Sequence, residues 1–439
     1  MRGQYIFLYE WKHLWHSPFK LVALLLFIAA AVYGLHNGAN LFHIQMEEIA
    51  SIQQKALEER QTIIGYYEQG KKGPEDRPWV NLAEPFWAIW STHVYHFKEP
   101  SPAMVYSIGQ AEQYGYYKRV LPRSTPYDAD MAQEIANPER LQSNNLDYAF
   151  VMLFLQPILL LILLYNLKSS EVEQGLLPLI EVQVSSGRIW LMVRMAFYLT
   201  LVLILNLGLL VYGAMLTGVF SSAGTIFGQV FLYSTAYLLF WSVLYFVILS
   251  RGKTIMGNAL QMAGIWLLLA FVIPAAVHQT VSMLKPANLM TDVIDATRDD
   301  RDALFELPDS TQLDQLNELF PEISNSPATQ DSSKRKAALD NSIFALINEL
   351  NKRSTVAVEH DNQLKNQLIQ ASYGFNPVTF FQNRLNSISK THYDDYEKFR
   401  SEIQALVDQQ IKLMVLDTWE GEEVDEQTYQ AYHKTLTIN

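Results

Sequence analysis

Few side chains in this chain of 439 residues have the type and spacing that catalysis or metal binding requires. His93 and His96 stand three residues apart, which is the spacing of two metal ligands on one helix. No third histidine stands close to them in the sequence, and Pro100 would end such a helix soon afterwards. An ordinary pair of polar side chains is therefore the simpler interpretation, and we expect no metal site.

A second short pattern is typical of nucleotide binding. Gly252, Lys253 and Thr254 match the end of a phosphate-binding loop, but the glycine that begins such a loop is missing, and the triplet opens an apolar run instead of following a strand. The sequence also contains no H-E-x-x-H or G-x-S-x-G motif and no pair of carboxylates within its apolar runs. We therefore expect neither catalysis nor a bound cofactor in this chain, and we interpret Lys253 as a membrane-surface anchor.

The notable carboxamide side chains within apolar runs are Gln156, Asn206, Asn258 and Gln261. An amide in hydrocarbon needs a hydrogen-bond partner, so bonds between neighbouring helices are the favoured role, and contact with a translocated molecule is the alternative. No run has a central Asp, Glu, Lys or Arg, which argues against a proton- or ion-coupled carrier. The energy for any movement would then enter from outside the bilayer.

These side chains must be positioned by the apolar runs themselves. Each run is about long enough to cross a hydrocarbon core roughly 30 Å thick, so we expect a membrane protein with five spans. The runs cover residues 19–35, 146–165, 189–216, 227–249 and 255–277. Pro157 and Pro274 can kink the second and fifth spans and free carbonyl groups for other partners.

Lys and Arg residues set the expected orientation, because positively charged links stay in the cytoplasm. They precede the first run and flank the links after the second and fourth runs: Arg2, Lys12, Lys20, Lys168, Arg188, Arg251 and Lys253. The N-terminus should therefore be cytoplasmic, and the polar residues 37–145 and 279–439 should lie outside.

The net charge of −12 argues against nucleic acid as a partner. The absence of cysteine is compatible with a bacterial inner membrane and periplasmic domains that are held by helix packing.

Residues 1–18 have the pattern of a helix that lies along the inner membrane surface. Aromatic and aliphatic side chains alternate there with Glu10, Lys12 and two histidines. Trp11 and Trp15 would anchor this helix among lipid head groups. A cleaved signal peptide is the alternative for the first run, but its leading region is long and rich in aromatic residues.

The two polar stretches should form a mostly helical domain. Helical spacing of apolar residues predicts long helices over residues 37–69, 339–364 and 394–416, the first projecting on the order of 50 Å from the bilayer. We expect these helices to pack side by side, with three independent surface helices as the alternative. Prolines and aromatics in residues 79–121 predict a compact irregular segment, and the charged residues 299–333 are the candidate for a mobile connector.

The link between the second and third spans is too long for a simple turn. Residues 166–188 offer a charged first turn, an apolar patch and a Gly-Arg exit, as expected of a short helix that docks on a cytoplasmic partner. A solvated connector is the alternative.

This link resembles the coupling helix of ABC-2 type transporter permeases. Residues 171–177 and 184–188 are similar to the E-x-E-x-G-T-L and P-V-S-R segments of that family. The polar stretches resemble a subgroup, related to gliding-motility and copper-maturation permeases, that carries a large insertion after the first span. Its motifs are matched by Gly109, Gln110, Tyr114, Tyr116, Tyr117, Asn137, Pro138 and Asp147, and a late motif by Asn376, Pro377 and Asn386.

The chain also departs from the family pattern. Leu176 replaces the usual Thr after Gly175, and Gly115 replaces a Pro. The sixth span of the family has no counterpart, because residues 419–439 are polar to the end. Either the C-terminus stays outside or the sequence stops short of a final helix.

The resemblance implies an all-α membrane protein with a bundle of five transmembrane helices, where the family has six, and a mostly helical extracytoplasmic domain. It would pair with a second copy or a homologous permease. ATP and Mg²⁺ would bind a separate ATPase that contacts the N-terminal helix around Glu10 and the link, at Lys168, Glu171, Glu173, Gly175 and Arg188. We expect substrate export or movement of the outer domain, which periplasmic or outer-membrane proteins could receive. The alternative is a non-transporting membrane anchor that recruits envelope proteins.

Overall fold

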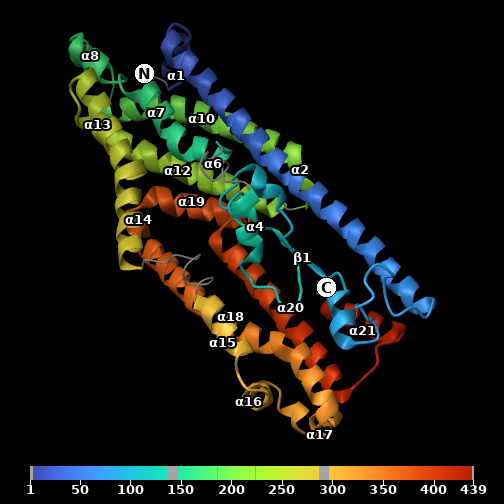
Figure 1. The fold of residues 1–439 in the computed structure, drawn as a ribbon. Coiled ribbons are helices and arrows are strands. Elements are labelled where there is room, and N and C mark those ends of the chain that lie inside the picture. Colours follow the sequence, from blue (N-terminus) through green and yellow to red (C-terminus); the bar gives the residue numbers. More distant parts are fainter. Residues whose placement is uncertain (1–2, 137–145, 185, 223, 286–295, 438–439) are drawn as a thin grey trace.

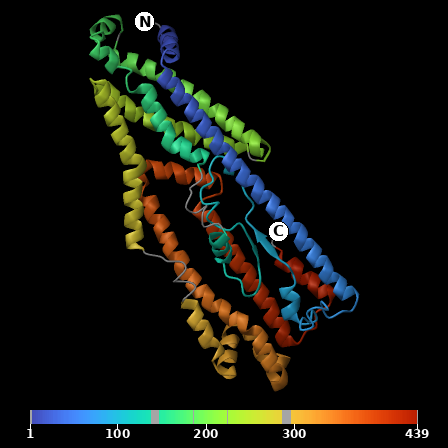
Figure 2. The same ribbon diagram turned by 45° about the horizontal axis from the view of Figure 1, so that its top comes forward.

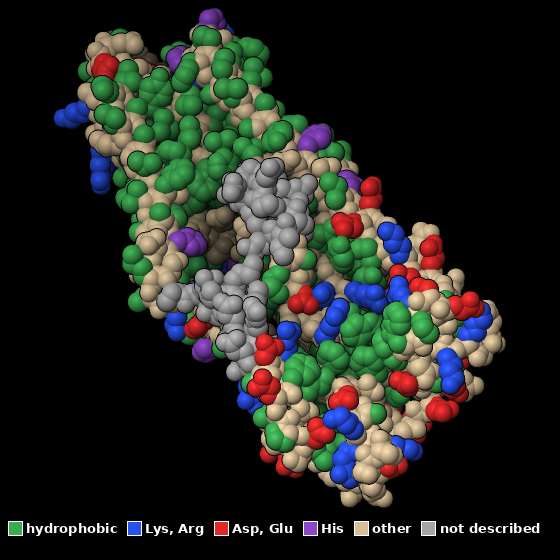
Figure 3. All heavy atoms as spheres, in the orientation of Figure 1, with side chains coloured by type: hydrophobic (Ala, Val, Ile, Leu, Met, Phe, Trp, Pro, Cys, Tyr) green, Lys and Arg blue, Asp and Glu red, His purple; other side chains and the backbone are tan. Residues whose placement is uncertain are grey.

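The computed structural model describes residues 3–136, 146–184, 186–222, 224–285 and 296–437. These residues are mostly helical, with one two-stranded sheet among them. Figure 1 shows an elongated molecule with a bundle of long helices at one end, which we call the spanning bundle. The other end, the polar domain, comprises the distal half of the first long helix and the described parts of residues 70–145 and 296–437. Figure 3 shows hydrophobic side chains over the spanning bundle and charged side chains gathered on the polar domain.

Five of the described helices are long and apolar enough to cross a membrane, and they coincide with the five expected spans, by which name we refer to them. They are Pro18–Glu68 (α2), Tyr148–Glu173, Gly187–Thr217 (α10), Gly224–Arg251 (α12) and Ile255–Leu284. The first span and the helix expected over residues 37–69 are one continuous helix of 51 residues. At this length α2 extends for roughly 75 Å and joins the spanning bundle to the polar domain (Figure 1).

The second and fifth spans each contain a π-helical turn next to a proline. The second consists of α6 (Tyr148–Phe150), η2 (Val151–Leu155), α7 (Gln156–Leu164) and α8 (Ser169–Glu173), and the fifth of α13 (Ile255–Leu267), η3 (Leu268–Val272) and α14 (Ile273–Leu284). Because Pro157 has no amide hydrogen, the carbonyl of Leu153 loses its helical partner. The hydroxyl of Tyr237 on α12 donates to this carbonyl at 2.5 Å. The freed carbonyl expected in the second span therefore bonds to a neighbouring span.

The irregular segment expected in the polar domain is present. It contains α3 (Pro85–Trp90), β1 (Tyr95–Phe97), η1 (Pro102–Val105) and β2 (Tyr117–Arg119), and α4 (Asp128–Ala136) follows it. β1 and β2 pair antiparallel, with Tyr95 opposite Arg119. The longer helices of the polar domain are α18 (Ser332–Ala371), α19 (Pro377–Ile388), α20 (Tyr393–Glu420) and α21 (Glu426–Leu436).

α18 and α20 pack side by side along most of the polar domain (Figures 1 and 2). Leu346 of α18 and Ile403, Val407 and Met414 of α20 are buried in their shared core. α2 instead packs against η1, β1 and α21. The expected packing of three long helices is therefore correct for α18 and α20. It is wrong for α2, because the irregular segment lies between α2 and this pair.

The prediction of a mobile connector over residues 299–333 is wrong. This region forms α15 (Ala296–Phe305), α16 (Asp309–Leu319), η5 (Pro321–Asn325) and α17 (Pro327–Gln330). The three α-helices pack against α18, and η5 packs against α20. Leu304, Leu316 and Ile323 are buried in the core of the polar domain. Each short helix buries only one or two apolar side chains, so no helical period extends far enough to be recognised in the sequence.

α19 fastens the polar domain to the spanning bundle. Its Phe381 meets Tyr237 of α12 edge to face, with the ring centroids 4.9 Å apart. Val378 and Leu385 of the same helix are buried in the core of the spanning bundle.

The N-terminal residues form the expected short helix, α1 (Gly3–Trp15). It packs on α10, where Phe7 meets Phe197 with ring centroids 5.5 Å apart. Trp11 and Trp15 are exposed, as an anchor among lipid head groups requires. The position of α1 at a membrane surface stays a prediction.

Candidate functional site

A buried cluster of charges lies at the end of the spanning bundle where α1 meets the link. Its centre is Arg194 of α10, whose side chain is 3% exposed. The guanidinium donates to the carboxylates of Glu10 and Glu171 and to the carbonyl of Leu167. Glu10 is fully buried, so neither of these two ions could be sustained there without its partner.

A second ring of polar groups completes the cluster. The hydroxyl of Tyr198 donates to Glu10 at 2.9 Å. The ammonium of Lys20 donates to this hydroxyl at 3.2 Å and to the carbonyl of Leu163 at 2.8 Å. The negative charges of the two carboxylates are therefore balanced by the positive charges of Arg194 and Lys20 within the cluster. Because the donors and acceptors satisfy one another, the cluster is suited to joining segments rather than to binding a ligand.

The cluster joins four segments of the chain. Glu10 comes from α1, Lys20 from α2, Glu171 from α8, and Arg194 with Tyr198 from α10. Two predicted site residues, Glu10 and Glu171, are thus brought together by an arginine that the sequence analysis missed. The available signal was an arginine early within an apolar run, which needs a nearby carboxylate.

The link contains two short helices, of which the first, α8, is also the last turn of the long second helix. α8 is followed by a turn at Gly175, whose φ of +69° favours glycine, and then by α9 (Leu177–Gln183). The carboxylate of Glu173 accepts a hydrogen bond from the amide of Ile255 at 2.7 Å, which places a negative charge at the N-terminus of α13. Lys168 donates to the carbonyl of Ser250 at 2.7 Å, next to the C-terminus of α12. The link is therefore connected to the second, fourth and fifth spans.

α9 presents apolar side chains away from the molecule. Leu179 is 63% exposed and Val182 is 88% exposed, while Leu177 and Ile180 pack against the spanning bundle. One side of this helix thus rests on the protein and the other lacks a partner among the described residues. Arg188, the last residue predicted for this site, is exposed and makes no ion pair with a described residue.

The intramembrane amides bond between helices, as favoured, in three of four cases. Asn206 of α10 donates to Gln156 of α7 at 2.7 Å. Asn258 of α13 donates to the carbonyl of Tyr165 at 3.4 Å. Gln261 is exposed on α13, and its side chain makes no hydrogen bond to a described residue.

The residues of the outer motif meet at the joint between the spanning bundle and the polar domain. Gly109 has a φ of +52° and lies against Thr391, whose carbonyl accepts from the amide of Gln110 at 3.0 Å. Asn386 accepts from the hydroxyl of Ser107 at 2.6 Å. These contacts fasten the segment before β2 to the α19–α20 turn.

Asp147 begins the second span in the same region. Its carboxylate accepts from the amides of Ile108 at 3.0 Å and Phe150 at 2.7 Å.

The tyrosines of the motif pack on different helices. Tyr114 lies against Tyr396 of α20, with ring centroids 5.0 Å apart. The hydroxyls of Tyr116 and Tyr117 both donate to Glu48 of α2. The motif therefore holds α2 and α20 around the irregular segment. Asn137 and Pro138 lie outside the described residues.

His93 and His96 do not share a helix. His93 precedes β1 with a φ of +50°, and its ring is 3.3 Å from the carboxylate of Glu59. His96 lies within β1 and is 2.9 Å from the carboxylate of Glu402. No group of three potential metal ligands occurs among the described residues. Each histidine thus has a glutamate of its own.

Comparisons with protein-family models, curated proteins and solved structures find no match. The function must therefore be argued from the site itself and from the sequence motifs.

Proposed function

We propose that the chain is the membrane-spanning permease subunit of an ABC-2 type transporter. A separate ATPase, which holds ATP and Mg²⁺, would dock on α9, and its closure would drive export of a substrate or movement of the polar domain. The observation that carries this proposal is that an exposed apolar helix, α9, and a carboxylate of the buried charge cluster, Glu171, belong to the same link. The resemblance of residues 171–177 to the coupling helix supports the same assignment.

The contacts of the link provide a route for the motion. A push on α9 reaches α8 through the turn at Gly175, and Glu171 passes it to Arg194 and hence to α10 and α1. Glu173 and Lys168 pass it to α13 and α12. Stretching a buried ion pair or a helix-end hydrogen bond costs free energy, so these segments should move as a unit.

The proposed topology places α1, the link and the other positively charged link in the cytoplasm of a bacterium. The polar domain would then lie in the periplasm, beyond the inner membrane. A second copy or a homologous permease would complete the channel, lipid would surround the bundle, and envelope proteins could receive the motion. The exposed Gln261 would face such a second subunit, because an amide gains nothing from hydrocarbon.

Substitutions on the exposed face of α9 test the proposal. The tagged chain is purified from membranes of its native cells, and vanadate-sensitive ATP hydrolysis of the preparation is measured. Val182→Arg should reduce this activity at least about tenfold, because a charge in the centre of an apolar contact prevents docking. Gln183→Arg, at the neighbouring exposed polar position, should have little effect.

Two results would contradict the permease function. One is a preparation of the unaltered chain that carries no ATPase, which is what a non-transporting membrane anchor would give. The other is full retention of ATP hydrolysis by the Val182→Arg variant, which would show that α9 is not the contact.

A further inference from the structure

A pocket of about 440 Å³ lies where the polar domain meets the spanning bundle. Its walls come from the residues before β2, the start of the second span, α14, α18, α19 and the start of α20. Figure 3 shows a recess at this level, between α14 and α19. The volume is within the range of pockets that bind small molecules.

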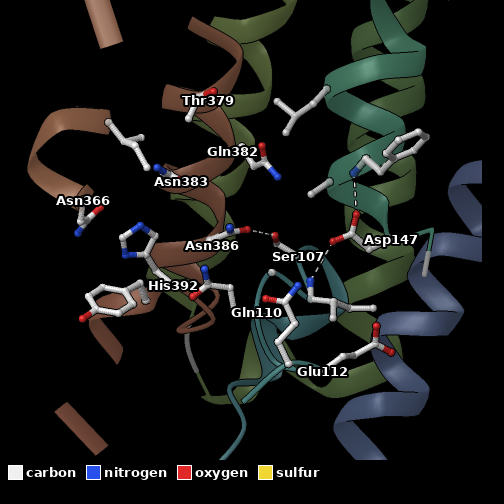
Figure 4. A pocket seen from close by; sticks show the side chains of 18 of the residues that line it. Ser107, Gln110, Glu112, Asp147, Asn366, Thr379, Gln382, Asn383, Asn386 and His392 are labelled. Atoms are coloured by element: carbon white, nitrogen blue, oxygen red, sulfur yellow. Dashed lines mark hydrogen bonds between the residues drawn. The ribbon is translucent and has the colours of Figure 1, made fainter. Parts of the chain in front are cut away.

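The pocket is lined mainly by uncharged polar side chains. Seven of the lining residues that the structure describes are Asn or Gln. Gln110 and Gln382 project into the pocket from opposite sides (Figure 4). The Oε1 atom of Gln110 is buried without a hydrogen-bond partner among the described residues. The side chains of Gln382 and Asn362 likewise make no hydrogen bond to a described residue. These amides thus retain donors and acceptors for a ligand.

The charges of the lining do not favour an ionic ligand. Among the described lining residues, Lys365 is the one Lys or Arg, Glu112 and Asp147 are the acidic residues, and His278 and His392 are the histidines. The carboxylate of Asp147 is already engaged by two backbone amides. A phosphate or sulfate would meet too few cations, and a metal ion too few carboxylates, so a neutral ligand fits the walls.

One wall of the pocket is apolar and belongs to the second span. Phe150, Leu153 and Phe154 line it on the side of the spanning bundle. Phe150 is exposed, and Phe271 of the fifth span contacts Phe154 with ring centroids 5.4 Å apart. A ligand with a polar head among the amides and an apolar tail along these rings would satisfy both kinds of wall.

We propose that this pocket binds a neutral saccharide, either free or as the head group of a lipid. Sugar hydroxyls each donate and accept hydrogen bonds, as carboxamides do, so a ring of amides matches a polyhydroxylated ligand without any net charge. The pocket has room for about two sugar rings. The binding goes beyond the proposed permease function and does not depend on an ATPase.

The test uses the full chain in phosphatidylcholine nanodiscs and isothermal titration calorimetry. The probes are hexyl glycosides of maltose, lactose and chitobiose, the three free disaccharides, and hexyl tri(ethylene glycol), and empty nanodiscs correct for partitioning. At least one disaccharide should bind saturably, free or as its glycoside. Equal binding of a free sugar and its glycoside identifies a free saccharide as the ligand, and a gain of tenfold or more from the hexyl chain identifies a lipid head group.

Substitutions in the pocket assign the binding to these amides. The double change Asn362→Leu and Gln382→Leu should weaken binding at least tenfold. Gln367→Leu, an exposed position of α18 that does not line the pocket, should leave it unchanged. If thermal unfolding shows that the double variant is unstable, the single change Gln382→Leu, at an exposed position, replaces it in the test. This single change should weaken binding about threefold or more.

The proposal is overturned if none of the sugars binds, if hexyl tri(ethylene glycol) binds as tightly as the glycosides, or if the stable pocket variants bind like the unaltered chain. None of these results would affect the ATPase measurement, so the two proposals fail separately.

Discussion

Arg194 connects two carboxylates that are far from it in the sequence, Glu10 of α1 and Glu171 of α8. The sequence predicts that both glutamates lie at the same end of the bundle, one from the amphipathic pattern of residues 1–18 and one from the resemblance to the coupling helix. That they share one cation could not be predicted, because the pairing depends on how α1 and α8 are placed around α10. The same holds for Asn206 and Gln156, each of which was expected to bond with some other helix.

We expect Arg194→Met to lower the free energy of unfolding by roughly 3–5 kcal/mol, because both buried carboxylates would lose their cation. Arg188→Met, at an exposed position of the same helix, should change it by less than about 0.5 kcal/mol. Denaturant unfolding of the detergent-purified variants, followed by circular dichroism, gives the comparison. Similar effects of the two changes would show that the cluster does not stabilise the bundle.

Among the elements, α2 is the helix that belongs to both parts of the molecule. Its path depends on two close approaches. A Cβ atom on Gly34 would lie 2.6 Å from the backbone of Asp147, and one on Gly38 would lie 2.7 Å from the carbonyl oxygen of Met104. Gly65, farther along α2, meets only the end of the Gln69 side chain, at 4.0 Å. The first two glycines thus let other backbone segments pack against α2.

Gly38→Ala should therefore destabilise the protein by about 1–3 kcal/mol, because the methyl group must displace backbone rather than a flexible side chain. Gly65→Ala should stabilise α2 by roughly 0.5–1 kcal/mol, since alanine loses less backbone entropy in a helix. Thermal unfolding of the two variants under identical conditions tests this difference in sign. Equal shifts in the same direction would mean that α2 does not approach η1 closely.

The elements that the sequence predicted are those with long regular patterns. The five spans, α2 and the pair α18 and α20 follow from apolar runs and helical periodicity. α15 to α17 were missed because each is too short to show a period. His96 was considered on a helix, yet it lies in a three-residue strand whose partner strand is more than twenty residues away, a pairing that local pattern does not encode.

In the whole molecule, the proposed points of input and output lie at opposite ends. α9 and the charge cluster are at one end of the spanning bundle, and α2 runs from that end of the bundle into the polar domain (Figures 1 and 2). A continuous helix resists bending over this length better than a chain of short elements would. This arrangement fits a protein that is driven from one face of a membrane and acts at the other.

The central claim is that α9 faces the cytoplasm and the polar domain faces the opposite side. Because the chain contains no cysteine, one introduced cysteine reports its own position. Gln183→Cys in α9 and Glu322→Cys in η5 are exposed positions that can be labelled with a membrane-impermeant maleimide in spheroplasts of a bacterial host. The account predicts that Glu322→Cys is labelled in intact spheroplasts and Gln183→Cys only after permeabilisation. Labelling of Gln183→Cys in intact spheroplasts would contradict it.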